Sequence, residues 1–261
     1  MPLVRFDELT YIEIAGILSD IKKAGLILPI GCTEQHGPFL SVGCDTAIAR
    51  GAAENLAKNL NTSEKEYRAY VLPDYSYSPS PGAEFIPGTI SMSFDWLGQG
   101  LKEIVTSAIK TGWNFCVIMN GHAQNIGRAI ETSMAAAQGE LGKPFPLVII
   151  NVYEYASIFN KHGLTPSSHA GEAEIALYSY YTGKKINTTG NFLLNHDMRN
   201  KPANIYGLSI MERSHGGIIT DDSIDLKRAI DVSNEIGREI DSLIIEKIIQ
   251  NLDIYFKEWI D

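Results

Sequence analysis

The chain has 261 residues, of which 44% are hydrophobic and 20% charged, a composition typical of a folded globular protein and not of a disordered chain. Its net charge of −9 argues against binding to nucleic acid or to an anionic membrane, because phosphate groups require a positive surface. The three cysteines do not make a disulfide framework, and no apolar run is long enough to span a bilayer. The first residues lack the pattern of a signal peptide, so we expect a cytoplasmic protein.

Apolar and amphipathic segments alternate along the chain and predict its secondary structure. Helices are expected over residues 7–23, 45–60, 94–111, 125–139, 171–181 and 223–252. Strands are expected over residues 25–30, 67–72, 115–119 and 146–152. The stretch 73–93 is rich in Pro, Ser and Gly and predicts a loop, whereas residues 182–220 show no clear pattern. Strands that alternate with helices predict a three-layer α/β/α fold with a mostly parallel central sheet, in one domain over residues 1–261.

Reactive side chains follow three of the predicted strands, at the edge of the sheet where open α/β proteins bind ligands. These side chains are Glu34, His36, Asp45, His122, His169, Glu172 and Glu174. Histidine nitrogens and carboxylate oxygens together suit Zn²⁺, Mn²⁺ or Fe²⁺, and one carboxylate can bridge two such ions. Each signal taken alone also fits a hydrogen-bonded structural histidine or a carboxylate at a helix N-terminus. Their convergence therefore predicts a metal site more strongly than any single member does.

Four segments resemble signatures of the creatininase (creatinine amidohydrolase) family and occur in the family's order. Leu28–Asp45 resembles L-P-x-G-[ST]-x-E-Q-H-G-P-H-L-P-x-x-x-D, and Phe85–Ser91 resembles F-P-G-T-I-S. Asn120–Asn125 resembles N-G-H-G-G-N, and His169–Ile175 resembles H-A-G-x-x-E-T. The resemblance implies a layered α/β/α fold with a dinuclear metal site, in a homo-oligomer that is usually a hexamer.

The resemblance also implies a ligand set. Glu34, Asp45 and His122 would hold one metal ion, Asp45 would bridge to the second, and His36 would bind that second ion. Creatininase completes the second site with a glutamate at the position that is Gln124 here, and an amide is a poor anionic ligand.

Two roles are left for the third motif. Glu174 is the expected substitute for the missing acid of the second site, and His169 would be the proton carrier, with Glu172 able to share that role. Two divalent ions held in this way would polarise a carbonyl group and lower the pKa of a water molecule, which then attacks an amide carbon. His169 would protonate the departing nitrogen, since an amine leaves badly without a proton.

The substrate is a separate question. The creatininase pocket uses tryptophans near the third motif, but the tryptophans here are Trp96, Trp113 and Trp259. Together with Gln124, this difference argues against creatinine itself. The wider family includes a formamidopyrimidine deformylase of flavin and deazaflavin biosynthesis and a peptidase of the mycofactocin pathway. The sequence does not select between a formamide, a cyclic amide and a small peptide.

We therefore expect a metal-dependent amidohydrolase with two divalent ions, acting on the C–N bond of a cyclic amide or formamide. One alternative is a single-metal hydrolase of small peptides or formamides, in which loss of the acid at position 124 has emptied the second site. The other is a non-catalytic family descendant that serves binding or assembly, although the intact ligand set argues against it. Cys32 and Cys44 are expected to be small buried residues that shape the metal-binding loop.

Overall fold

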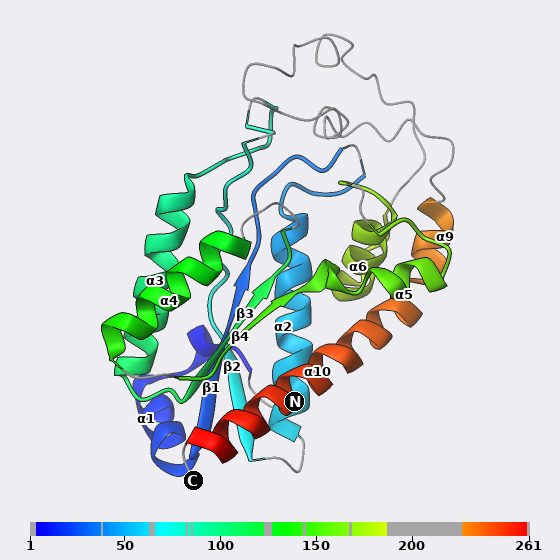
Figure 1. The fold of residues 1–261 in the computed structure, drawn as a ribbon. Coiled ribbons are helices and arrows are strands. Elements are labelled where there is room, and N and C mark those ends of the chain that lie inside the picture. Colours follow the sequence, from blue (N-terminus) through cyan, green and yellow to red (C-terminus); the bar gives the residue numbers. More distant parts are fainter. Residues whose placement is uncertain are drawn as a thin grey trace.

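The computed structural model describes residues 4–37, 39–62, 66–81, 83–84, 86–122, 127–142, 145–166, 169–186 and 226–259, so the stretch without a clear pattern lies outside the described residues from 187 onward. At its centre is a parallel sheet in which the strands lie in the order β2-β1-β3-β4 (Figure 1). The strands are β1 (Lys23–Ile30), β2 (Tyr67–Val71), β3 (Phe115–Asn120) and β4 (Leu147–Asn151). The expected parallel central sheet is confirmed.

Helices cover both faces of this sheet, which confirms the three-layer architecture (Figure 1). One face carries α2 (Cys44–Thr62), α5 (Ala156–Lys161), α6 (Glu172–Thr182), α9 (Leu226–Asp231) and α10 (Ser233–Trp259). The other carries α1 (Tyr11–Asp20), α3 (Phe94–Lys110) and α4 (Gly127–Leu141). Two short 3-10 helices, η1 (Phe6–Glu8) and η2 (Val152–Glu154), complete the described elements.

Side-chain alternation along the central strands builds two separate cores. Ile27 of β1 packs in the core beneath α2, α6 and α10, whereas its neighbours Leu26 and Leu28 pack beneath α3 and α4. All but the first residue of β1 and every residue of β3 are buried, because helices cover the sheet on both sides. Continuous apolar runs in the sequence are typical of such strands.

Two helix predictions were wrong in their extent. Residues 7–23 do not form one helix, because Thr10 begins a new one: its side chain accepts from the Glu13 N–H while the Glu13 carboxylate accepts from the Thr10 N–H. The predicted helix 223–252 consists of α9 and α10 with Val232 between them, and α10 continues to residue 259. The Val232 N–H still donates to the Arg228 carbonyl oxygen at 3.0 Å, so α10 follows α9 directly without a loop. Helix α5 was not predicted.

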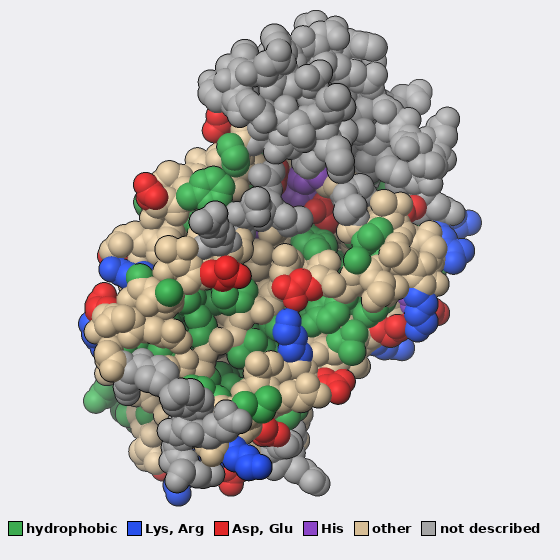
Figure 2. All heavy atoms as spheres, in the orientation of Figure 1, with side chains coloured by type: hydrophobic (Ala, Val, Ile, Leu, Met, Phe, Trp, Pro, Cys, Tyr) green, Lys and Arg blue, Asp and Glu red, His purple; other side chains and the backbone are tan. Residues whose placement is uncertain are grey.

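None of the helices in the described ranges combines the length and the apolar composition needed to cross a bilayer. On the face drawn in Figure 2, the described Lys and Arg side chains lie among acidic and apolar ones, with several grouped at the right edge.

Candidate metal centre

The candidate site lies at the carboxyl ends of β1 and β3, the two central strands. From β1 the chain passes through α2 to β2 on one side, and it then returns through α3 to β3 on the other, so the strand order reverses here. Gly31 and Gly121, the first residues after the two strands, let the start of α2 come close. A Cβ atom on Gly31 would lie 2.3 Å from the Thr46 nitrogen, and one on Gly121 would lie 2.3 Å from the Asp45 carbonyl oxygen. The first turn of α2 is therefore packed against both strand ends.

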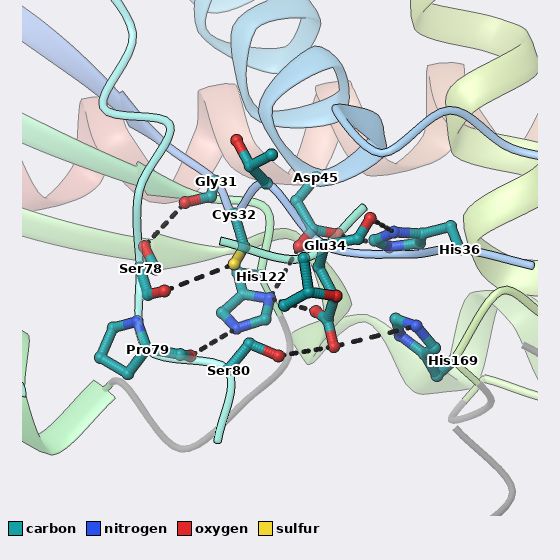
Figure 3. Close-up of polar contacts among 12 residues, drawn as sticks. Gly31, Cys32, Glu34, His36, Asp45, Ser78, Pro79, Ser80, His122 and His169 are labelled. Carbon is teal, nitrogen blue, oxygen red and sulfur yellow. Dashed lines mark hydrogen bonds and ion pairs between the residues drawn. The ribbon is translucent and has the colours of Figure 1, made fainter. Parts of the chain in front are cut away.

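Asp45 is at the centre of the site and is buried. Its Oδ1 lies 2.9 Å from Nε2 of His36, which belongs to the loop after β1. Its Oδ2 lies 2.7 Å from Nδ1 of His122, which follows β3 (Figure 3). One carboxylate thus connects two histidines from neighbouring strand ends.

A first group of potential metal ligands surrounds one oxygen of Asp45. Its members, whose ligand atoms all lie within 4.8 Å of one another and which are all buried, are Cys32, Glu34, Asp45 and His122. The Glu34 carboxylate is held on one side, where Oε1 accepts a hydrogen bond of 2.8 Å from Ser80 Oγ. Its other oxygen, Oε2, is buried without a hydrogen-bond partner, and His122 Nδ1 lies 3.5 Å from it. A buried carboxylate oxygen in this state is costly unless a cation neutralises it.

A second group lies beside the first and contains His36, His169 and Glu174, with ligand atoms again within 4.8 Å of one another. Nε2 of His36 lies 3.6 Å from Glu174 Oε2. That oxygen accepts a hydrogen bond of 2.5 Å from the N–H of Ala170, a residue with a left-handed φ of 56°. A non-glycine residue is strained in this conformation, and such strain is concentrated at functional sites. Because His169 lies in this group, its ring could serve either as a metal ligand or as a proton carrier.

Burial and mutual charge shift the pKa values of the carboxylates. Burial raises the pKa of Glu34 and of Glu174 above the ordinary value. Burial would also raise the pKa of Asp45, but the charges and hydrogen bonds of His36 and His122 outweigh it and lower that pKa. Asp45 is therefore the carboxylate that stays ionised most firmly.

The histidines divide into two kinds. Burial alone would lower the pKa of His36, but Asp45 and Glu174 raise it to about 10, and Asp45 and Glu34 likewise raise the pKa of His122. Burial lowers the pKa of His169 to about 4. Protons on the first two histidines thus balance the buried carboxylates, and a divalent cation fits the site because it can take the place of those protons.

The structure brings together six of the seven predicted site residues in these two groups: Glu34, His36, Asp45, His122, His169 and Glu174. Glu172 belongs to neither group. It is buried in the first turn of α6, and its carboxylate accepts a hydrogen bond of 2.6 Å from the Thr165 N–H. Gln124 lies outside the described residues.

Sequence reasoning missed the segment that closes the site between β2 and α3. Ser78 Oγ donates to the Gly31 carbonyl at 2.7 Å, and Ser80 holds Glu34 as described above. Between them, the Pro79 carbonyl oxygen lies 3.1 Å from Nε2 of His122 (Figure 3). Nothing in a Pro- and Ser-rich loop indicates which residues turn toward a distant histidine, so no sequence signal could have found them.

Fold and site together define an α/β/α protein with a buried cluster of metal-ligand side chains at the carboxyl edge of its sheet. A family model described as "Creatininase: Creatinine amidohydrolase" matches residues 7–251. The chain therefore belongs to the creatininase family.

The similarity to individual relatives covers only part of the chain. The mycofactocin precursor peptide peptidase of Mycolicibacterium smegmatis is 34% identical over 39% of this chain and 40% of its own length. The 3-dehydro-scyllo-inosose hydrolase of Thermotoga maritima is 28% identical over 57% of this chain and 47% of its own length. The chain thus spans less than half the length of these two curated relatives. Solved structures of creatininase, including a Zn–Zn form and a manganese form, share the fold with a TM-score of 0.66, 20% identity and 99% coverage of both chains.

Proposed function

We propose that the chain is a metal-dependent hydrolase that cleaves the C–N bond of a cyclic amide or formamide. The observation that carries this proposal is the pair of buried ligand groups that meet at Asp45. Imidazole and carboxylate ligands are typical of hydrolytic zinc and manganese sites. Solved creatininases of the same fold include Zn–Zn and manganese forms, which supports two divalent ions here.

Glu34, Asp45 and His122 would hold one ion, and His36 and Glu174 would hold the other beside them. Two ions in these positions would supply polarisation of the scissile carbonyl group and a water molecule of lowered pKa. The protein's contribution is to hold the carboxylate ligands in place and to shield them from solvent. Ser80 fixes one oxygen of Glu34, and the Ala170 N–H fixes one oxygen of Glu174.

His169 would carry the proton. Because burial lowers its pKa to about 4, the ring is neutral near physiological pH and can accept a proton from the attacking water. Nε2 lies 2.7 Å from the Gln35 carbonyl oxygen and 3.9 Å from Oε1 of Glu34, so the ring is held beside the first ligand group. We infer that the His169 ring takes the proton and delivers it to the departing nitrogen. Glu172 would act one step away, by holding the loop before α6 through its bond to Thr165.

The substrate panel follows from the relatives and from the aromatic residues. The M. smegmatis relative is named for a precursor peptide, so short peptides belong in the panel beside cyclic amides and formamides. Creatinine is the less favoured member. Trp113 is buried in the second core, where its ring contacts Phe6 and Tyr70, and Trp96 lies in the first turn of α3, so neither belongs to the loop that follows β4.

The test combines metal content with hydrolysis rates for wild type, His36→Ala and His162→Ala. His162 is a matched control, because it pairs with Glu239 at 3.0 Å on α10 and belongs to neither ligand group. We expect about two ions per chain and metal-dependent hydrolysis for wild type and for His162→Ala. His36→Ala should lose an ion and most of the rate. Equal rates in all three proteins, unchanged by removal of metal, would overturn the proposal, and one ion in wild type would favour the single-metal alternative.

We also propose that the chain assembles as a homo-oligomer, with the hexamer that is usual in its family as the expected state. Sedimentation equilibrium of the untagged protein measures this directly, and a monomer at all concentrations would contradict it.

A further inference from the structure

Cys32 is a side chain that the proposed function leaves unused, and it lies within the first ligand group. It is the second residue after β1 and is completely buried. Its Sγ lies within 4.8 Å of ligand atoms of Glu34, Asp45 and His122, beside the His122 ring in Figure 3. The thiol donates a weak hydrogen bond of 3.4 Å to the Ser78 carbonyl oxygen. Burial and the charges of Asp45 and Glu34 raise its pKa, as expected for a thiol that faces those carboxylates.

A second observation independently indicates that a cation belongs at this position. Oε2 of Glu34 is buried without a hydrogen-bond partner, and the Glu34 side chain is completely inaccessible to solvent. The family pattern quoted above has serine or threonine at the position of Cys32, so the sulfur is a feature of this chain. A hydroxyl group could fill the same space, but only a thiolate is a strong ligand for a soft divalent ion.

We propose that Cys32 is the fourth protein ligand of the first metal position, and that it makes this position selective for a thiophilic divalent ion, Zn²⁺ or Co²⁺, over Mn²⁺. This inference rests on the metal-dependent function proposed above. Thiolate sulfur, carboxylate oxygen and imidazole nitrogen are all donors that Zn²⁺ accepts, and Zn²⁺ can expand to five-coordination, which would leave room for water beside four protein ligands. The second group offers only nitrogen and oxygen, so the two positions differ in their preference.

Ligation by Cys32 has a defined proton balance. The Sγ–H bond breaks, the Sγ–metal bond forms, and the proton leaves to the buffer. No oxidant or reductant takes part. The hydrogen bond from the thiol to the Ser78 carbonyl is lost at the same time, but it is weak, so its loss opposes metal binding only slightly.

Cobalt substitution tests the proposal through a signal that does not depend on turnover. A thiolate bound to Co²⁺ gives a sulfur-to-metal charge-transfer band in the near ultraviolet, whereas nitrogen and oxygen ligands do not. We expect this band in wild type, its loss in Cys32→Ser, and its persistence in Cys44→Ser, a buried cysteine that belongs to neither ligand group. Zn²⁺ affinity should fall at least about tenfold in Cys32→Ser, while Mn²⁺ affinity should change much less.

The wild-type protein alone also decides the question, in case Cys32→Ser does not fold. X-ray absorption of the zinc-loaded protein should show sulfur at about 2.3 Å from zinc. Bound ions with only nitrogen and oxygen neighbours, or a cobalt spectrum without the charge-transfer band, would overturn the role of Cys32 and leave the proposed hydrolase intact. Failure to bind any divalent ion would instead overturn the proposed function, and this inference with it.

Discussion

Asp45→Asn is the substitution that tests the organisation of the site most directly. Asparagine keeps the volume of the side chain but removes the charge that lies 2.9 Å from His36 and 2.7 Å from His122. Its terminal amide offers one acceptor and one donor atom, so it cannot serve both rings as the carboxylate does. Because Asp45 belongs to one ligand group and contacts a member of the other, we expect both metal positions to lose their ions.

The magnitude for the metal-free protein follows from His36. Burial alone would lower its pKa, but Asp45 and Glu174 raise it from 6.5 to about 10. At about 1.4 kcal/mol per pKa unit, this rise corresponds to a contribution on the order of 5 kcal/mol to folding. Removal of one partner from a buried ion pair typically costs about 3–5 kcal/mol. We therefore expect Asp45→Asn to lower the free energy of unfolding by about 3–5 kcal/mol near neutral pH.

The pH dependence gives the sign of the effect. Because the pKa of His36 is raised in the folded state, its contribution is complete below about pH 6.5 and is lost as the pH rises through 10. Urea unfolding of the metal-free proteins at about pH 6 and about pH 10 measures it, and plasma mass spectrometry measures metal content. Tyrosine and lysine ionise in both proteins, so the difference between wild type and variant isolates the contribution of Asp45. A variant that keeps two ions, or that unfolds with the wild-type free energy at the lower pH, would refute this reasoning.

Three further predictions concern packing, protons and ligand orientation. A Cβ atom on Gly237 of α10 would lie 2.1 Å from a tyrosine ring carbon of α6, whereas nothing lies within 4 Å of one on Gly139 of α4. In urea unfolding, Gly237→Ala should therefore destabilise the protein by about 1–3 kcal/mol, and Gly139→Ala should stabilise it by about 0.5–1 kcal/mol. Metal affinity should rise with pH, about tenfold per unit for each proton displaced, because the pKa of His36 is about 10 in the metal-free protein. Calorimetry in two buffers of different ionisation enthalpy counts those protons. Ser80→Ala removes the hydroxyl that orients Glu34 and should weaken metal binding about 10- to 100-fold in competition with a chelator dye.

Each of these three predictions has a result that contradicts it. Equal effects of the two alanine substitutions would mean that α6 and α10 do not pack as closely as described. Metal affinity that is flat between neutral and alkaline pH would mean that His36 is not protonated before the ion binds. Wild-type metal affinity in Ser80→Ala would mean that the hydroxyl does not hold the glutamate in its ligand position.

The strands of the sheet were predictable because their sequence pattern is local. Buried parallel strands are apolar along their whole length, so residues 25–30 and 115–119 could be recognised as strands without any knowledge of their neighbours. The structure extends them only slightly, to Lys23–Ile30 and Phe115–Asn120. The helix boundaries were harder to predict, because a hydrogen bond made by one side chain can decide where a helix begins. The reciprocal bonds of Thr10 and Glu13 begin α1 in the middle of a pattern that looked continuous, although the T-x-x-E spacing was present in the sequence.

The candidate site was predictable in its members but not in its arrangement. Motifs identified the acids and histidines because each follows a strand end. Spacing cannot show that His169 comes close to His36, with ring centroids 4.4 Å apart, since the direction of a side chain in a loop depends on tertiary contacts. For the same reason, the contacts that Ser78–Ser80 make with the site could not be predicted from the sequence. The thiol of Cys32 was predicted to be buried, which is correct, but its neighbours could be identified only in three dimensions.

The residues of the two ligand groups are spread along the chain from Cys32 to Glu174, and this spread determines when during folding the metal can bind. Cys32, Glu34 and His36 are close in sequence, but each group also needs a ligand from a distant segment, His122 or Glu174, and closing those loops costs chain entropy until the sheet has formed. Ion uptake should therefore come at the end of folding and report that β1, β3 and α6 have docked. A newly made chain would acquire its metal only after release of the segment that carries the third motif.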